Sequence, residues 1–408
     1  MRLATEPRIR AGDSLDRQVF AGVRRRAVLE GCKWDPQVGD VSTLAEFPLF
    51  LSRRSWDELA TLAERLTSEA LAAEGEVLHR PDLLNGLGLP RRIRAALRAD
   101  GPPSPAAARA MRFDFHPTTD GWRISEVNSD VPGGFTESSF FTELIAANVG
   151  GARPAAVPIT PWADAIARAA GQGGRVGLLS APGFMEDHQI VAYLAEQLRA
   201  RGCETHITNP KQLTWRNGEA HLAAAWYEGR LDAVVRFYQG EWLASLSPAH
   251  WTGLFRGGRT PIANPGAAVI PESKRFPLVW EHLRTPMPTW RSLLPESRDP
   301  RDAPWSSDDG WLVKSAMSNT GDTVSMRDSM SAREWRRVFW SVTLCPWAWI
   351  AQRRFESRPI DTPRGAMHAC LGVYTIDGVA AGAYARLSQK PVIDYEAVDC
   401  ALLVEPGE

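Results

Sequence analysis

The sequence lacks the residue patterns that mark disulfide-rich, zinc-binding and nucleophile-based proteins. Its 408 residues contain five cysteines, none in a Cys-x-x-Cys pair, and eight scattered histidines. An odd, dispersed set of cysteines argues against a disulfide framework or a zinc site and favours reduced thiols in a cytoplasm. No Ser-His-Asp or Cys-His set is evident, so catalysis through a protein nucleophile is not indicated.

Excess charge and long apolar runs are also missing. The formal net charge is −1 at pH 7, and such a balance gives no support to a nucleic-acid or membrane-surface partner. No uninterrupted apolar stretch approaches the ~20 residues of a membrane span. The opening segment MRLATEPRIRAGDSLDRQ has no apolar core of a secretory signal. We therefore expect a cytoplasmic protein with no nucleic-acid or membrane partner.

Two common nucleotide-binding motifs are absent as well. The chain has no Gly-x4-Gly-Lys-[Ser/Thr] P-loop, and its run Gly171-Gln-Gly-Gly precedes a predicted strand instead of joining a strand to a helix. A P-loop or dinucleotide-binding fold is therefore disfavoured.

The most informative segment is residues 111–134, MRFDFHPTTDGWRISEVNSDVPGG. It reads as a hairpin with strands over 111–115 and 122–128. A three-residue loop that ends at Gly121, in the left-handed conformation, would place Asp114 opposite Glu126 and Arg112 opposite Asn128. Directly paired side chains share one face of a sheet, with Cβ atoms ~5 Å apart.

Such a pairing of carboxylates requires a positive partner. Two carboxylates ~4 Å apart repel by roughly 4 kcal/mol at an effective dielectric of 20. Asp114, Glu126 and the amide oxygen of Asn128 offer hard oxygen ligands to a divalent ion, and magnesium brought by a nucleotide is the natural candidate. The alternative is a solvated face on which Asp114 simply pairs with Arg112 or Arg123.

The remaining sequence predicts a chain of four parts. They are a mainly helical N-terminal region (1–110), the hairpin with a helix (111–150), a small α/β domain (151–262) and a C-terminal part (263–408). In the first part, helices are expected over 15–29 and 55–78, with Ser55 as an N-cap. In the third, strands over 175–180, 203–207 and 231–238 alternate with a helix over 186–201, which favours a parallel sheet.

The C-terminal part contains residues suited to binding phosphates. Lys274 opens a predicted helix, and Lys314 ends a predicted strand. The loop that follows carries Ser318, Asn319 and Gly321, and its backbone amides can cover triphosphate oxygens that Lys314 neutralises. Gln352 lies on a predicted strand that would border a purine pocket. An antiparallel pair over 367–376 and 379–387, joined at Asp377-Gly378, carries Arg386.

This combination resembles the circularly permuted ATP-grasp enzymes, specifically the synthetase part of glutathionylspermidine synthase and its stand-alone relatives. The resemblance runs from Lys33-Trp-Asp-Pro-Gln through Arg236-Phe-Tyr-Gln-Gly-Glu-Trp242 to the C-terminus, and is tightest at the hairpin. It implies an α/β (α+β) ATP-grasp-like fold, with a small parallel α/β domain and a helical N-terminal region. The acidic ligands precede the lysines, which is the order that the permuted form implies.

The resemblance assigns roles to individual residues. Asp114, Glu126 and Asn128 match the Mg²⁺ ligands, and Arg112 and Arg386 match catalytic arginines, Arg112 steadying the transferred phosphoryl group. The residues that match ATP-binding positions are Lys274, Lys314, Ser318, Asn319, Gly321 and Gln352.

The implied activity is that of an ATP-dependent carboxylate–amine ligase, which forms an amide through an acyl phosphate and releases ADP and phosphate. A non-catalytic ATP-binding regulator and a phosphotransferase remain alternatives. The small-molecule carboxylate and amine are not identified, and an amino acid, a peptide or a polyamine is possible. Relatives active on glutathione have serines where this chain has Val131-Pro132-Gly133, so Gly133 and Gly134 are substrate-side candidates. His188, near the start of the predicted 186–201 helix, is another.

Overall fold

The computed structural model describes residues 7–38, 41–317, 324–394 and 396–406. The predicted loop residues Ser318, Asn319 and Gly321 lie outside the described residues. A six-stranded sheet of order β22-β21-β20-β5-β6, with β19 paired to β20, occupies the centre. Its strands are β5 (Ala110–Thr118), β6 (Gly121–Asn128), β19 (Ile360–Thr362), β20 (Gly365–Ile376), β21 (Val379–Ser388) and β22 (Val398–Cys400).

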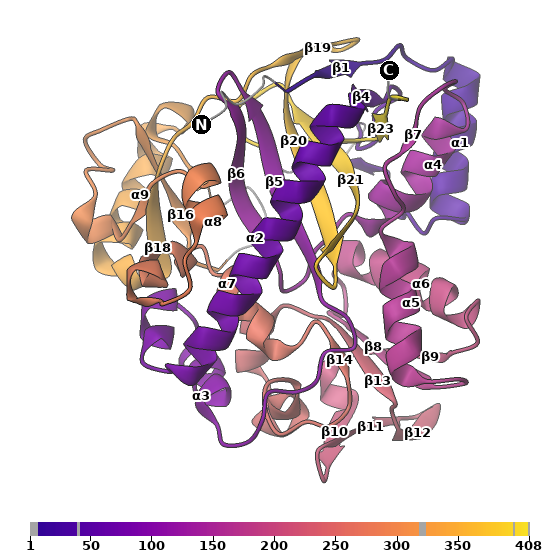
Figure 1. The fold of residues 1–408 in the computed structure, drawn as a ribbon, viewed down its shortest axis with the longest axis vertical. Coiled ribbons are helices and arrows are strands. Elements are labelled where there is room, and N and C mark those ends of the chain that lie inside the picture. Colours follow the sequence, from indigo (N-terminus) through magenta and orange to yellow (C-terminus); the bar gives the residue numbers. More distant parts are fainter. Residues whose placement is uncertain (1–6, 39–40, 318–323, 395, 407–408) are drawn as a thin grey trace.

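The long helix α2 (Arg53–His79) crosses one face of this sheet (Figure 1). Met111, Phe113 and Phe115 of β5 belong to the hydrophobic core that α2 covers. Because successive side chains of a strand point to opposite faces, Arg112 and Asp114 face away from α2. The burial of the alternate apolar residues thus fixes the face on which the charged residues gather.

The α2 helix begins three residues earlier than the sequence predicted. Ser52, not Ser55, is the N-cap, and its Oγ accepts a hydrogen bond from the backbone N–H of Ser55 at 3.2 Å. Ser55 is itself buried in the first helical turn. Both serines suit an N-cap, and the extra apolar-facing turn decides between them.

The register of the β5–β6 hairpin is confirmed at the two pairs that matter, Arg112 with Asn128 and Asp114 with Glu126. The predicted three-residue loop is wrong, because Thr118 pairs with Gly121 and leaves a two-residue turn. A β-bulge compensates for the difference. Between Asp114 and Phe115 the register shifts by one, so that Ser125 has no partner on β5.

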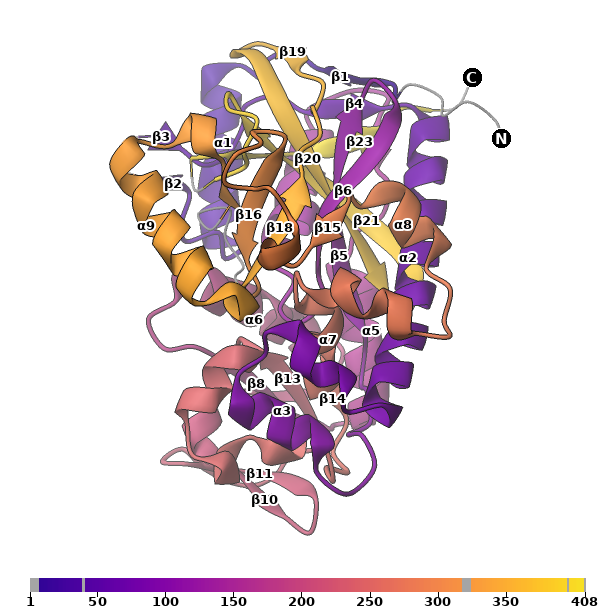
Figure 2. The same ribbon diagram turned by 90° about the vertical axis from the view of Figure 1, so that its left-hand side faces the viewer.

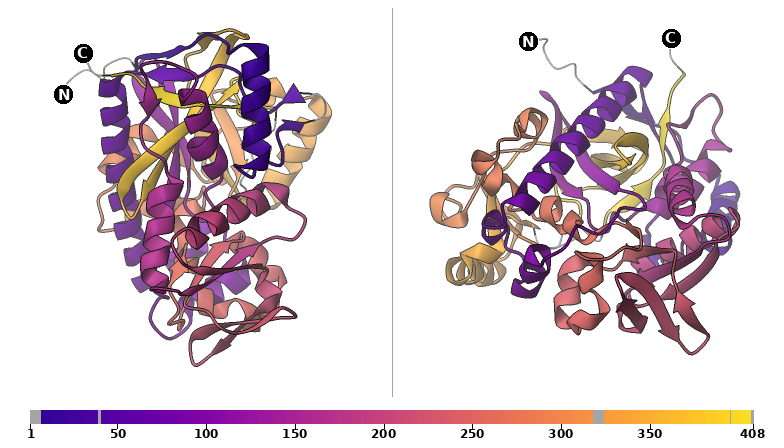
Figure 3. Two further views of the ribbon diagram at one scale, coloured as in Figure 1. Left: turned by 90° about the vertical axis from the view of Figure 1, so that its right-hand side faces the viewer. Right: turned by 60° about the horizontal axis from the view of Figure 1, so that its bottom comes forward.

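A lobe with a parallel sheet lies at the lower end of the molecule, in rose and magenta in Figures 1 and 3. Its four-stranded sheet has the order β14-β13-β8-β9, and every neighbouring pair is parallel. The elements are α5 (Ile159–Ala170), β8 (Arg175–Ser180), α6 (Met185–Arg199), β9 (Glu204–Thr208), β13 (Ala233–Phe237) and β14 (Ile262–Ala263). A three-stranded antiparallel sheet adjoins it, formed by β10 (Leu213–Arg216), β11 (Glu219–Ala224) and β12 (Tyr227–Arg230). The predicted alternation of strands and helix is confirmed here.

A second small lobe, in orange, faces the viewer in Figure 2. It combines the helix α9 with an antiparallel sheet of order β15-β18-β16-β17. The elements are β15 (Ser297–Arg298), β16 (Trp311–Ser315), β17 (Val324–Ser325), α9 (Ala332–Leu344) and β18 (Trp349–Arg353). Lys314 and Gln352 lie on neighbouring strands of this lobe, with Gln352 opposite Leu312.

The ends of the described chain are joined in a further sheet of order β1-β4-β23-β7. Its strands are β1 (Ile9–Ala11), β4 (Leu49–Leu51), β7 (Arg153–Pro154) and β23 (Leu402–Val404), and a two-stranded pair is formed by β2 (Gln37–Val38) and β3 (Val41–Ser42). The other helices are α1 (Arg17–Leu29), α3 (Arg91–Arg98), α4 (Thr142–Ala146), α7 (Val269–Glu272) and α8 (Pro288–Leu293), with a π-helical segment over Glu137–Phe141 and short 3-10 turns that include Leu83–Leu87, Gly240–Ser245 and Phe276–His282.

Lys274 does not open a helix, contrary to the sequence-based expectation. It lies in the turn between α7 and the 3-10 turn over Phe276–His282, because the backbone leaves the helical conformation at Ser273. None of the helices in the described part of the chain combines the length and apolar character needed to cross a membrane. The division of the chain into four parts stays a prediction.

Candidate functional site

The carboxylate of Asp114 is the centre of a buried cluster on the sheet face opposite α2. Arg112 donates to its Oδ1 through Nε at 2.8 Å and to its Oδ2 through Nη2 at 3.1 Å. Arg386, on the other side of β20, donates to Oδ2 at 2.7 Å, and the amide nitrogen of Asn128 does so at 3.2 Å. The sheet thus brings together four of the residues that the sequence singled out.

These contacts explain the ionisation of the cluster. Burial by itself favours the neutral acid, but the guanidinium groups of Arg112 and Arg386 outweigh it and hold the pKa of Asp114 below its usual range. The carboxylate therefore remains charged at neutral pH. Arg112 reaches it by running across Gly372, where an added Cβ would lie 2.8 Å from Arg112 Cδ. The strand β20 needs glycine at this point because the arginine stem occupies the space.

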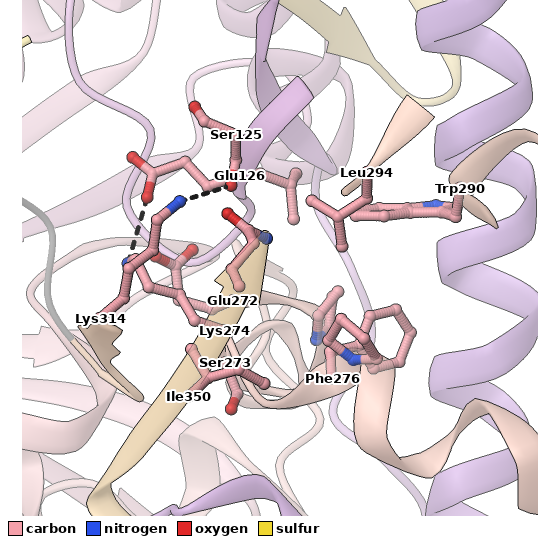
Figure 4. Close-up of a pocket in the computed structure, with 14 residues that line it drawn as sticks. Ser125, Glu126, Glu272, Ser273, Lys274, Phe276, Trp290, Leu294, Lys314 and Ile350 are labelled. Atoms are coloured by element: carbon pink, nitrogen blue, oxygen red, sulfur yellow. Dashed lines mark hydrogen bonds and ion pairs between the residues drawn. The ribbon is translucent and has the colours of Figure 1, made fainter. Parts of the chain in front are cut away.

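Glu126, opposite Asp114, meets the two lysines (Figure 4). Lys274 Nζ lies 3.3 Å from Glu126 Oε2, and Lys314 donates to the backbone oxygen of Ser125 at 3.1 Å. Ser125 is the bulged residue of β6, so its carbonyl is available to a side chain from another lobe. The bulge therefore links the hairpin to β16.

The two lysines differ in acidity. Burial works against the charged form of Lys274, but Glu126 and Glu272 outweigh it and raise its pKa. For Lys314, burial together with the charge of Lys274 prevails over Glu126 and lowers the pKa to about 8. At neutral pH both lysines are mainly protonated, but Lys314 is close to its titration point.

Two adjoining pockets meet at these side chains. Ser125, Glu126, Lys314 and Gln352 line both of them. One pocket continues to Asp114, His116, Cys370 and Arg386, and the other to Lys274 and an apolar end formed by Phe276, Trp290, Leu294 and Ile350. Figure 4 shows the charged residues and the aromatic residues at opposite ends of the second pocket. The site can therefore hold a ligand with one polyanionic and one apolar part.

The donor set fits a magnesium ion. Among the described residues no three His, Cys, Asp or Glu side chains gather to hold a metal by themselves, and the predicted set consists of two carboxylates and an amide. Asp114 Oδ2 accepts three hydrogen bonds, whereas Oδ1 accepts only that of Arg112. Each carboxylate oxygen offers about two lone-pair sites, so Oδ1 retains one for a cation. Asn128 uses its nitrogen towards Asp114, which leaves its oxygen as the ligand atom.

The family comparison extends over most of the chain. Residues 21–401 match the model of a family described as glutathionylspermidine synthase pre-ATP-grasp. The chain belongs to this family. The resemblance recognised in the sequence and the mixed α/β fold that it implied are thereby confirmed. A search of curated proteins found no match.

Solved structures share the fold at low sequence identity. A glutathione synthetase-like effector from Globodera pallida, in its apo form, has a TM-score of 0.62 and 12% identity, with 95% of this chain and 97% of that chain covered. A putative gamma-glutamylcysteine synthetase from Methylobacillus flagellatus KT has a TM-score of 0.41 and 12% identity, with 83% and 87% covered. D-alanyl-alanine synthetase A from Vibrio cholerae has a TM-score of 0.33 and 9% identity, with 57% and 87% covered.

In this family member, the segment after Asn128 is tied down by buried charges that the sequence did not reveal. Asp130 forms an ion pair with the fully buried Arg236 and accepts the backbone N–H of Gly240 at 2.7 Å. Glu272 accepts the backbone N–H groups of Ser129 and Asp130 at 2.6 and 2.9 Å. Burial raises the pKa of Glu272 to about 7 in spite of Lys274. No motif marks these partners, because they come from segments more than a hundred residues away.

The glycine pair that follows lies beside the arginines. The carbonyl of Gly133, rather than its N–H, faces them, accepting hydrogen bonds from Arg112 at 3.0 Å and from the hydroxyl of Tyr374 at 2.6 Å. Gly134 has a φ of +84°, and an added Cβ would lie 2.6 Å from the Tyr384 hydroxyl. Whether either glycine contacts a substrate stays a prediction.

Two histidines differ in their relation to the site. His116 lines the same pocket as Asp114 and lies 3.0 Å from Ser125 Oγ, and burial lowers its pKa to about 4, which keeps it neutral. In the described part of the chain, His188 is not brought to either of the two pockets. It lies at the start of α6, where its Nδ1 is 3.3 Å from Ser180 Oγ, and its substrate-side role stays a prediction.

Proposed function

We propose that this protein is an ATP-dependent carboxylate–amine ligase that forms an amide bond through an acyl phosphate. Membership of a synthetase-type family supports the class. The individual roles given below rest on the geometry of the site.

The observation that carries the proposal is the convergence of four cationic side chains on two facing carboxylates. Arg112 and Arg386 bind Asp114, Lys274 binds Glu126, and Lys314 binds the intervening Ser125. Two positive charges therefore remain in excess, if Arg112, Arg386, Lys274 and Lys314 are set against Asp114 and Glu126. A buried excess of positive charge beside hard oxygen ligands suits a magnesium-bound polyphosphate.

The pockets suggest how ATP would lie. The apolar end near Trp290 and Phe276 suits a purine, with Gln352 on β18 at its border. The triphosphate would then reach Lys274 and Lys314, and extend towards Arg112 and Arg386. When bound by Asp114, Glu126 and Asn128, Mg²⁺ would offset charge on the phosphate oxygens.

The chemistry needs positioning and charge neutralisation rather than a protein nucleophile. An oxygen of the substrate carboxylate attacks the γ-phosphorus, forming an acyl phosphate while the bond to ADP breaks. Arg112 and Arg386 stabilise the equatorial oxygens during this transfer. The acceptor amine then attacks the acyl carbon, the carbon–oxygen bond to phosphate breaks, and the amine loses a proton as the amide forms.

The test is a product analysis with purified protein, ATP, Mg²⁺ and panels of carboxylates and amines. A ligase releases ADP and phosphate together with an amide, and only when both organic substrates are present. ADP without free phosphate, accompanied by a phosphorylated product, would instead identify a phosphotransferase. Binding of ATP without turnover of any pair would favour a non-catalytic regulator.

A further inference from the structure

A buried lysine, Lys33, draws three carboxylates together next to the candidate site. Its Nζ lies 2.8 Å from Asp35 Oδ1, 2.5 Å from Glu137 Oε1 and 3.3 Å from Asp399 Oδ2. The Lys33 side chain is only 6% exposed. Three acceptor groups around one ammonium form the kind of surroundings that a protein offers to a bound primary amine.

This cluster adjoins the two arginines of the site. Asp399 on β22 is the register partner of Arg386 on β21. The hydroxyl of Tyr384 accepts a hydrogen bond from Arg112 at 3.5 Å. Burial raises the pKa of Tyr384, and the charges of both arginines, of Asp399 and of Glu137 all act on it. One tyrosine therefore stands between the phosphoryl-transfer end of the site and the carboxylates that Lys33 holds.

The cluster is also accessible from solvent. The side chain of Glu137 is 5% exposed, but that of Asp399 is 17% and that of Asp35 is 36% exposed. A small cation could therefore reach the carboxylates from the Asp35 side if the lysine were absent.

The loop that carries Lys33 has anchors besides the ammonium. The backbone N–H of Lys33 donates to the carbonyl of Ala27 at 2.9 Å, and that of Trp34 donates to Gln189 Oε1 at 2.9 Å. Removal of the charged group should therefore leave the loop in place. A role limited to fastening this loop does not account for three carboxylates converging on one ammonium.

We propose that Lys33 is a specificity-determining residue: its ammonium fills a cation pocket formed by Asp35, Glu137 and Asp399, and so excludes acceptor amines that carry a second ammonium group. The statement about acceptors rests on the proposed ligase function, whereas the cation pocket does not. A substrate ammonium at this place would meet the repulsion of Lys33 and find its carboxylate partners already engaged.

The test compares the wild-type chain with Lys33→Ala, which removes both charge and volume, and Lys33→Met, which removes charge and keeps most of the volume. Lys211→Ala, at an exposed position of the α/β lobe, is the matched charge control. Binding of ethylammonium and putrescine is measured by calorimetry and thermal shift at constant ionic strength, with acetamide as a neutral probe.

We expect Lys33→Ala to bind both cations at least about tenfold more tightly than the wild type, since each would recover charge-assisted hydrogen bonds. Lys33→Met and Lys211→Ala should bind as weakly as the wild type, and acetamide should bind none of the variants. Adding Asp399→Asn to Lys33→Ala should remove most of the gain. If Lys33→Ala is unfolded alone, ethylammonium should raise its Tm towards that of the wild type. Equal binding by Lys33→Ala and the wild type, an equal gain in Lys33→Met, or a lack of such rescue overturns the proposal.

The catalytic arm uses a monoamine that the wild type accepts and the diamine of matching length. The ratio of kcat/KM for diamine to that for monoamine should rise about tenfold in Lys33→Ala. An absence of turnover in every variant would count against the ligase function alone, because the binding measurements decide the role of Lys33 independently.

Discussion

Arg386 donates to the carboxylate of Asp114 at 2.7 Å across 272 positions of sequence. The sheet order β21-β20-β5 makes this contact possible, since β20 separates the two strands and carries the small residues Gly372 and Cys370 between them. The arginine and the carboxylate thus meet over a narrow strand surface. Strand order, rather than proximity in sequence, assembles the charged end of the site.

Replacement of Glu126 by glutamine should abolish turnover while leaving the fold intact. The amide keeps the volume but removes the charge that attracts both Lys274 and a metal ion, so we expect kcat/KM to fall about 10²–10³-fold. Glu228→Gln, which alters an exposed glutamate on β12, should behave as wild type. Circular dichroism and ADP release measure the two properties, and normal activity of Glu126→Gln would remove this residue from the mechanism.

The hairpin shows how far the sequence reaches. The pairing of Asp114 with Glu126 was predictable because turn residues and alternation set the register to within one position. The bulge at Ser125 was not, since it depends on the space between β5 and β6 and on Lys314 arriving from another lobe. The prediction was correct because the shorter turn and the bulge shift the register by one residue in opposite senses.

Other parts of the site could not be predicted for a similar reason. Lys33 and Arg236 lie inside segments that carry the family resemblance, but their carboxylate partners come from distant elements. Buried ion pairs have no periodic signal in a sequence, unlike the apolar alternation that revealed β8 and β13. The division between Ser52 and Ser55 as N-cap failed because both are suitable, and only packing of the first turn distinguishes them.

The affinity for ATP should depend on pH through Lys314. Its pKa of about 8 means that the protonated, phosphate-binding form is lost as pH rises through 8. Calorimetry with a non-hydrolysable ATP analogue and Mg²⁺ between pH 6.5 and 9.5 should show weakening binding over this range. Glu272, with a pKa of about 7, gains charge beside Lys274 and should weaken binding earlier. In Lys314→Met, the step near pH 8 should disappear and the step near pH 7 should remain.

The same lysine should affect stability with the opposite sign. Its folded pKa of about 8 lies below the ordinary value of 10.5, so between these values the unfolded chain binds more protons than the folded protein. The contribution of this group to the free energy of unfolding therefore increases as pH rises from about 8 to 10.5. The difference between wild type and Lys314→Met, measured by urea denaturation at pH 7.5 and 9.5, should change in that direction. A difference that is independent of pH would contradict the assignment.

The two glycines after Val131 should respond differently to substitution. Gly134→Ala should destabilise the protein and impair activity, because φ is +84° and the new Cβ would lie 2.6 Å from Tyr374 and Tyr384. Gly133→Ser should fold, since its added Cβ would stand 3.3 Å from Glu186 Oε1 and 3.6 Å from Arg112 Nη1. We expect its hydroxyl to change KM for the organic substrates more than KM for ATP. Steady-state kinetics and thermal melting test both statements, and a change confined to KM for ATP would exclude a substrate-side role.

The buried pair of Arg236 and Asp130 should be essential to the stability of the segment that follows Asn128. Both side chains are fully enclosed, and Arg236 also donates to the carbonyl of Asn264 at 3.1 Å and to that of Tyr238 at 2.9 Å. Arg236→Met leaves a charged carboxylate without its partner, so we expect the free energy of unfolding to fall by about 3–5 kcal/mol. The control Arg230→Met removes an exposed arginine paired with Asp232 and should cost about 1 kcal/mol or less. Adding Asp130→Asn to Arg236→Met should cost less than the sum of the single changes, because the stranded charge is removed. Additive losses in urea denaturation would show that the two side chains act separately.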